Sequence, residues 1–141
     1  MSAGQLFTIT NTLAVFGWLM LAVLPGRRWV TDVVTGTALP AGFAVLYIGI
    51  VVTTFFSADG SVATLDGVAN LFSNPWLLLA GWLHYLAFDL LIGTWEVRDA
   101  GERVVPHLLL VPCLFLTLMF GPAGWLAYTA VRQRPSRAVS V

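Results

Sequence analysis

The fold is decided by residues 75–95, which read PWLLLAGWLHYLAFDLLIGTW. A bilayer core about 30 Å thick needs about 20 apolar residues in one helix, and this stretch has that length. Trp76 and Trp95 stand near its two ends, about 28 Å apart along a helix axis. Tryptophan is enriched at both membrane interfaces. The stretch therefore predicts a helix that crosses the membrane and is anchored at each interface by a tryptophan.

Three further apolar segments have a similar length. They cover residues 5–24, 38–56 and 106–131. We therefore predict an all-α fold, an integral membrane four-helix bundle of up-down topology, with residues 1–141 forming one transmembrane domain. Gly121 and Pro122 interrupt the last segment, which predicts a kinked fourth helix. The alternative is a broken helix whose freed carbonyls line a pocket.

The composition agrees with a membrane protein. Of the 141 residues, 58% are hydrophobic and 10% are charged, far below the roughly 25% charge of a soluble domain. This excludes a soluble enzyme, a disordered tail and a nucleic-acid binder. All seven basic residues are arginine, which suggests a GC-rich bacterial source and hence a bacterial inner membrane. Cys113 is the single cysteine, so no internal disulfide can form.

The charges of the loops predict an orientation. Residues 26–35 and 96–105 each carry two arginines, whereas residues 57–74 carry two aspartates and no basic residue. The positive-inside rule places the two arginine-bearing loops in the cytoplasm and the N-terminus outside. Four spans, however, would place three further arginines outside, against the same rule: Arg132, Arg134 and Arg137. Apolar residues at helical spacing between 62 and 72 predict a short interfacial helix.

Two titratable groups, His84 and Asp89, lie near the middle of the third segment. A carboxylate at the bilayer centre costs about 2.5–3.5 kcal/mol, so we expect Asp89 to face the bundle interior, with Tyr85, Gly93 and Glu96 on the same stripe. At 100° per residue, His84 and Asp89 are about 140° apart on the helix. They cannot chelate one metal as an i, i+4 pair would, but they can flank one pocket.

These positions give the candidate site. The candidate catalytic residues are His84, Asp89 and Tyr85, and the candidate pocket or supporting residues are Trp82, Glu96, Asp99 and His107. Structural roles are the alternative for each: hydrogen bonds between helices for His84 and Asp89, ion pairs in a solvated loop for Glu96 and Asp99, and an interfacial position for His107. No common catalytic motif is present, and we predict no metal site and no cofactor.

Two blocks carry a recognisable pattern: residues 82–95 (WLHYLAFDLLIGTW) and 120–124 (FGPAG), with Asp99, Pro106 and His107 between them. This pattern resembles that of the abscisic-acid-deficient-four-like family of small four-helix membrane proteins. The resemblance covers nearly the whole chain. That family includes the plant plastid protein required for neoxanthin formation, so the resemblance implies action on a carotenoid or a related isoprenoid.

The reaction implied by the resemblance converts the epoxide violaxanthin into the allene neoxanthin without redox chemistry. It needs an acid for the epoxide oxygen and a base for a proton on the polyene. Carried over by position, Asp89 is the acid, His84 the base and Tyr85 a hydrogen-bond donor. The alternative is a non-enzymatic membrane module that binds a pigment or scaffolds other membrane proteins, or a second copy of itself. Convergence of His84 and Asp89 on one apolar cavity would favour the enzyme.

Overall fold

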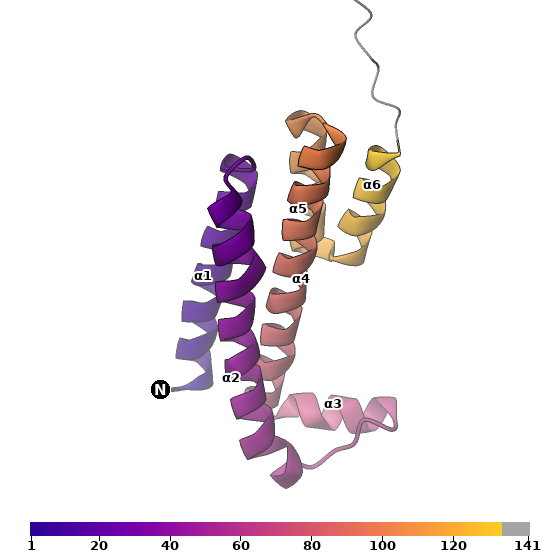
Figure 1. The fold of residues 1–141 in the computed structure, drawn as a ribbon. Coiled ribbons are helices and arrows are strands. Elements are labelled where there is room, and N and C mark those ends of the chain that lie inside the picture. The colour runs from indigo at the N-terminus through magenta and orange to yellow at the C-terminus, as the bar shows by residue number, and fades with distance from the viewer. Residues whose placement is uncertain (134–141) are drawn as a thin grey trace, which may run out of the picture.

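The computed structural model describes residues 1–133, and nearly all of these residues are helical (Figure 1). Three long helical segments run side by side, and α4 lies at the centre because it contacts all the other α-helices. The elements in chain order are α1 (Ala3–Val23), the π-helix η1 (Val30–Ala38), α2 (Leu39–Thr54), the 3₁₀ turn η2 (Phe55–Ser57), α3 (Leu65–Ser73), α4 (Pro75–Arg103), α5 (His107–Phe120) and α6 (Pro122–Arg132).

Three segments are long and apolar enough to cross a membrane: α1, α4, and the continuous helix from Val30 to Ser57. They correspond to the first three predicted spans, and their length and composition are those of membrane-spanning helices. Many large apolar side chains on α1 and α2 remain exposed, as lipid contact requires, since a membrane-facing helix has no reason to bury them.

Helix α4 begins where the sequence predicts but ends later. Asn74 caps it, with its Oδ1 accepting a 2.9 Å hydrogen bond from the Trp76 N–H, and Pro75 occupies the first turn, where its missing N–H costs nothing. The helix then continues to Arg103. The prediction of a loop at residues 96–105 is therefore wrong for residues 96–103, which are helical. Glu96 and Asp99 are helical residues and extend the stripe that contains Asp89.

The fourth predicted span is not a single kinked helix, and the up-down four-helix bundle is not confirmed. Helix α5 stops at Gly121, whose φ of +40° is a conformation that favours glycine, and Pro122 then starts α6 without needing an N–H partner. Helix α6 turns back along α5 toward the end from which α5 started (Figure 1). A side chain at Gly124 would collide with the Thr117 backbone, so this close return depends on glycine. We call α5 and α6 together the helical hairpin.

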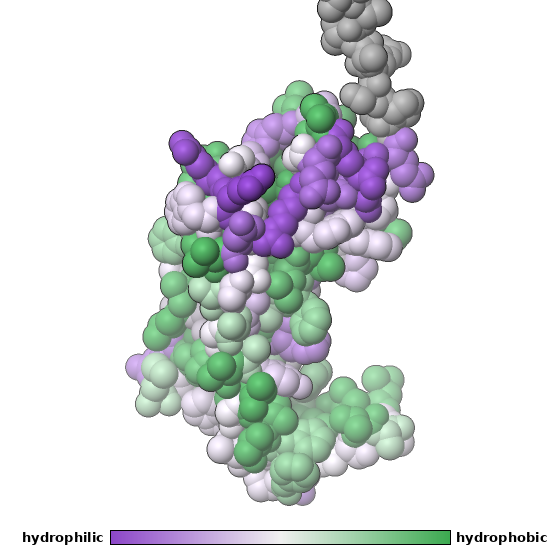
Figure 2. All heavy atoms as spheres, in the orientation of Figure 1, coloured by the Kyte–Doolittle hydropathy of each residue, from purple (hydrophilic) through white to green (hydrophobic). Residues whose placement is uncertain are grey.

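Helix α3 lies across the end of the bundle opposite the helical hairpin's open end (Figure 1). Thr64 caps it, its Oγ1 accepting a 3.1 Å hydrogen bond from the Gly67 N–H, and Leu71 packs inward while Leu65 and Phe72 stay exposed. The predicted helix in this loop is confirmed. Figure 2 shows hydrophilic residues gathered at the opposite end, where α1 meets η1 and α4 meets α5. An amphipathic helix in this position is suited to the membrane interface.

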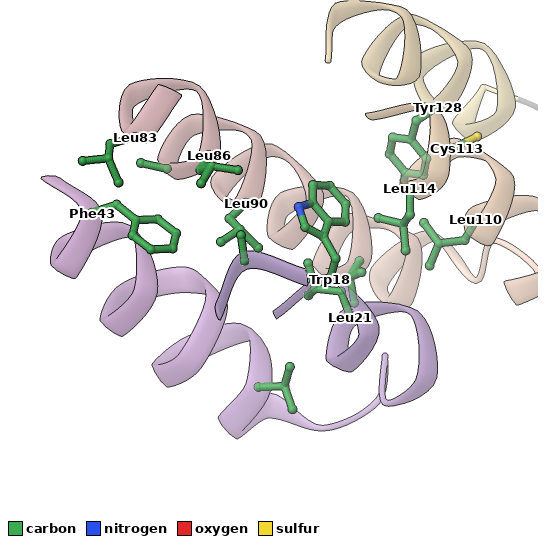
Figure 3. Packing of buried hydrophobic residues seen from close by; sticks show 14 of the residues in the cluster. Trp18, Leu21, Phe43, Leu83, Leu86, Leu90, Leu110, Cys113, Leu114 and Tyr128 are labelled. Carbon is green, nitrogen blue, oxygen red and sulfur yellow. The ribbon is translucent and has the colours of Figure 1, made fainter. Parts of the chain in front are cut away.

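The core forms around α4 (Figure 3). Trp18 and Leu21 of α1 and Phe43 of α2 pack on one side of α4, and buried residues of the helical hairpin pack on another. Gly93 of α4 lies against the Trp18 ring, which leaves no room for a side chain there. Because neighbouring helices cover it from several directions, α4 can hold polar groups away from lipid. Figure 3 labels the core residues that α4 and the helical hairpin contribute: Leu83, Leu86, Leu90, Leu110, Cys113, Leu114 and Tyr128.

Candidate functional site

Three acidic side chains of α4 lie on the face that the helical hairpin covers. Asp89 and Asp99 are each 8% exposed and Glu96 is fully buried, so the predicted burial of Asp89 is confirmed. Thr117 of α5 donates a 2.9 Å hydrogen bond to Glu96 Oε1. Within residues 1–133, Asp89 Oδ2 and Glu96 Oε2 have no hydrogen-bond partner. Buried oxygens without partners are rare because they are costly, which makes this face of α4 the candidate site.

Asp99 closes one end of this acidic face. Its carboxylate accepts hydrogen bonds from the Tyr128 hydroxyl at 2.7 Å, from Arg132 at 2.7 Å and from Arg103 at 3.0 Å. The Trp95 ring meets the Tyr128 ring edge-on and lies 4.9 Å from the Arg132 guanidinium carbon. A carboxylate with this many charged and neutral donors is well satisfied. Asp99 therefore fastens α6 to α4 rather than belonging to a solvated loop.

Asp89 lies halfway along α4, at the tip of the helical hairpin. A Cβ placed on Gly121 would stand 3.2 Å from Asp89 Oδ1, so the carboxylate lies directly beside the break between α5 and α6. Tyr85, one turn earlier on α4, donates a 3.0 Å hydrogen bond to the Leu118 carbonyl in the last turn of α5. The last carbonyls of a helix lack partners within the helix, and Tyr85 satisfies one of them. The structure thus brings Tyr85, Asp89 and Glu96 together on one face.

His84 lies on a different face of α4. Its ring is 4.6 Å from the Phe88 ring and 5.8 Å from the Tyr47 ring of α2, and it lines a groove of about 310 Å³ bordered by α2, α3 and α4. The side chain is exposed from the protein and points away from the helical hairpin. The structure therefore does not bring His84 and Asp89 to one pocket.

Trp82 and His107 lie at different ends of the molecule. The Trp82 ring stacks on Tyr85 with ring centres 5.2 Å apart, and it is 5.7 Å from Phe7 of α1. Trp82 also lines an apolar groove of about 340 Å³ between the beginnings of α1 and α4. His107 is the exposed first residue of α5, at the arginine-rich end. Trp82 is thus adjacent to the acidic face, whereas His107 is not.

Sequence reasoning did not pair the three acidic side chains with the groups that complete this face. They are Thr117 and Tyr128, which donate to Glu96 and Asp99, and Gly121, which makes room for Asp89. Thr117, Gly121 and Tyr128 lie at approximately helical spacing in the last predicted span, a pattern that close packing between helices also explains. In the described part of the chain, no group of three histidine, cysteine, aspartate or glutamate side chains is placed to hold a metal ion.

No curated protein and no solved structure matches the chain. The family described as ABA DEFICIENT 4-like matches residues 5–128, which run from the first turn of α1 into α6 and include the whole acidic face. The resemblance first carried by the 82–95 and 120–124 blocks is confirmed. The chain belongs to the ABA DEFICIENT 4-like family.

Proposed function

We propose that this membrane protein isomerises a carotenoid or a related isoprenoid by proton transfer at Asp89. The observation that carries the proposal is the Asp89 carboxylate, 92% buried at the middle of the central helix, with Oδ2 lacking a hydrogen-bond partner in the described residues. Ionisable groups at this depth mark functional sites because their insertion is costly. The family supplies the substrate class through the resemblance described above.

An apolar molecule would approach Asp89 along the part of this α4 face that the helical hairpin does not cover. The helical hairpin covers the half of α4 that follows Asp89, while the same face before Asp89 carries Leu78 and Trp82, which are 55% and 37% exposed. These two side chains border the groove between α1 and α4. Trp82 then stacks on Tyr85, which is one helical turn from Asp89. A polyene lying in this groove would direct one end toward Tyr85 and Asp89, with aromatic rings along its length.

The proposed reaction requires no redox partner. Asp89 in its neutral form donates a proton to the epoxide oxygen as the carbon–oxygen bond breaks, and the carboxylate so formed takes a proton from the polyene carbon as the allene forms. The second proton replaces the first, so the substrate keeps its atoms and its charge. One carboxyl group with two oxygens suffices for both transfers. Tyr85 orients the oxygen-bearing end of the substrate.

His84 has no role in this proposed step. The resemblance implies that Asp89 is the acid and His84 the base. This division of the two catalytic roles requires both side chains to reach one substrate. The His84 ring instead lies among Tyr47 and Phe88 on the groove between α2, α3 and α4. Glu96 lies two turns beyond Asp89 and is hydrogen-bonded to Thr117, which suits a supporting group that holds α5 in place.

The test is conversion of violaxanthin by the purified chain in phosphatidylcholine nanodiscs, with products separated by chromatography. Asp89→Asn keeps the shape but removes the transferable proton, so we expect turnover to fall about 100-fold or more. Asp66→Asn, on the exposed side of α3, is the matched control and should keep full activity. Equal activity of Asp89→Asn and the parent chain would refute the assignment.

A second function, pigment binding without chemistry, is favoured by the separation of His84 from Asp89 and by the hydrogen bonds that already tie Tyr85 to α5 and Glu96 to Thr117. Such bonds can serve as structural links between helices. In this case the organic extract of the purified protein would contain a pigment that remains chemically unchanged. Asp89→Asn would then alter yield or thermal stability and leave the bound pigment the same.

A further inference from the structure

The groove beside His84 is a second feature of the molecule, separate from the acidic face. It has a volume of about 310 Å³ and is walled by α2, α3 and α4. Ligand pockets in proteins measure about 300–1,000 Å³, so this groove has room for one small molecule or for one end of a longer one. Phe72 of α3 forms part of its outer wall and lies close against Gly81 of α4.

His84 is the one imidazole in a groove whose other walls are almost entirely apolar. It lies five residues from Asp89, about 7.5 Å along the helix from the centre of α4, and a bilayer core extends about 15 Å on each side of its centre. No hydrogen bond connects the His84 ring to another residue in the described part of the chain, and the rings of Tyr47 and Phe88 lie beside it. An imidazole left without a partner in hydrocarbon is costly.

The chemistry of the walls defines the partner that fits. Among residues 1–133, no arginine, lysine, aspartate or glutamate lines the groove, so a charged ligand would lose its hydration without compensation. A hydroxyl group can either donate to or accept from an imidazole, and it therefore suits either neutral form of His84. The aromatic rings of Tyr47, Phe55 and Phe72 provide flat surface for unsaturated or ring-bearing carbon chains.

We infer that the groove between α2, α3 and α4 binds the hydroxyl-bearing end of an unsaturated, lipid-soluble alcohol, with His84 forming the hydrogen bond to its oxygen. The ligand enters from the lipid beside α3, whose Leu71 and Phe72 close the groove on its outer side. This site does not depend on proton transfer at Asp89. In this site His84, which the sequence marks as a candidate functional residue, has a role in binding.

Histidine NMR offers a direct test because the chain has only two histidines, His84 and His107. The protein is labelled with ¹⁵N-histidine, placed in phosphatidylcholine nanodiscs and titrated with farnesol, a 15-carbon isoprenoid alcohol. We expect the His84 ring signals to shift and saturate while those of His107 stay fixed. Farnesene, which lacks the oxygen, should leave the His84 signals near their starting positions. Equal shifts at both histidines, or none at His84, would overturn the inference.

Variants separate specific binding from partition into lipid. His84→Phe keeps a ring for contact with Phe88 and Tyr47 but removes the nitrogens, so retention of radiolabelled farnesol should weaken about three- to tenfold. Gly81→Leu fills the groove, because even a Cβ there approaches the Phe72 ring to 3.2 Å, and should abolish saturable binding. Gly49→Leu, at an exposed position with open space around it, is the control.

Circular dichroism of each variant shows whether it is folded. Folded Gly81→Leu protein that binds farnesol as the parent chain does would contradict the proposed site. Gly49→Leu should bind farnesol as the parent chain does, whereas equal farnesol retention by the parent chain and all three folded variants would show that farnesol resides in the surrounding lipid, and this would also overturn the inference. Because the readout is binding and not turnover, failure of the Asp89 proposal would leave this result intact.

Discussion

Tyr128, near the end of α6, donates a 2.7 Å hydrogen bond to Asp99 Oδ2 on α4. Both residues are buried, and Arg132 adds an ion pair of 2.7 Å to the same carboxylate. Asp99 is near the end of α4, at the side of the molecule where α5 begins. The contact therefore fixes the end of α6 at the side from which α5 entered, and the helical hairpin does not cross to the side that holds α3.

The helical hairpin predicts three membrane crossings and places the end of α6 on the same side of the membrane as the arginine-bearing segments 26–35 and 96–105. Single cysteines at Glu102 and Gln133, in a Cys113→Ala background, should react with a membrane-impermeant maleimide from one side. A cysteine at Asp59 should react from the other side. By the positive-inside rule the first side is the cytoplasm. This arrangement also removes the conflict that four spans create for Arg132.

Labelling of Gln133→Cys from the same side as Asp59→Cys would mean that residues 107–132 cross the membrane. That result would contradict the arrangement of α5 and α6 as a helical hairpin on one side of the membrane. Solubilised protein labelled at all three positions serves as the control for reagent access.

The Tyr128–Asp99 hydrogen bond should contribute measurably to stability. Tyr128→Phe removes only the hydroxyl, and hydrogen bonds to charged groups contribute about 1.5–3 kcal/mol. We expect the free energy of unfolding to fall by about that amount in a denaturant titration of the detergent-solubilised protein. Tyr47→Phe is the matched control, because the Tyr47 hydroxyl makes no hydrogen bond within residues 1–133. Equal losses for both variants would argue against a special role for Tyr128.

Any side chain at position 121 should lower the stability of the folded protein. The Gly121 φ of +40° lies in a region that residues with a Cβ rarely adopt, with a cost of about 1–3 kcal/mol, and the added Cβ would press on Asp89. Gly121→Ala should therefore lower the midpoint of thermal unfolding. Gly101→Ala, in α4 with open space around it, should raise stability by about 0.5–1 kcal/mol. A stabilising Gly121→Ala would show that the turn between α5 and α6 is not as described.

The π-helix η1 is attached to α4 by a buried pair of threonines. Thr94 donates a 2.8 Å hydrogen bond to Thr35 Oγ1, which in turn donates to the Val30 carbonyl. Thr94→Val and Thr35→Val keep the volume and remove the hydroxyls. In a double-mutant cycle the two changes should show an interaction energy of about 1 kcal/mol. Strictly additive losses would mean that the two hydroxyls do not stabilise each other.

The sequence was sufficient for the features that depend on local chemistry. Hydropathy over about 20 residues predicts α1, α2 and α4 as spans, because each must satisfy its own backbone hydrogen bonds in lipid. The 100° rotation per residue places Tyr85, Asp89 and Glu96 on one stripe, and the cost of a carboxylate in lipid predicts burial of that stripe. The same local reasoning identifies α3 as an amphipathic helix.

Tertiary contacts decided the remaining features. A glycine–proline pair permits either a kink or a reversal, and the reversal is set by Gly124 packing on Thr117 and by Tyr128 binding Asp99, all contacts between different helices. The position of His84 was decided in the same way. Its rotation relative to Asp89 is fixed by the helix, but whether both meet one pocket depends on where α2, α3 and the helical hairpin pack around α4. Local periodicity specifies the faces of a helix, whereas the partners of those faces come from contacts distant in the sequence.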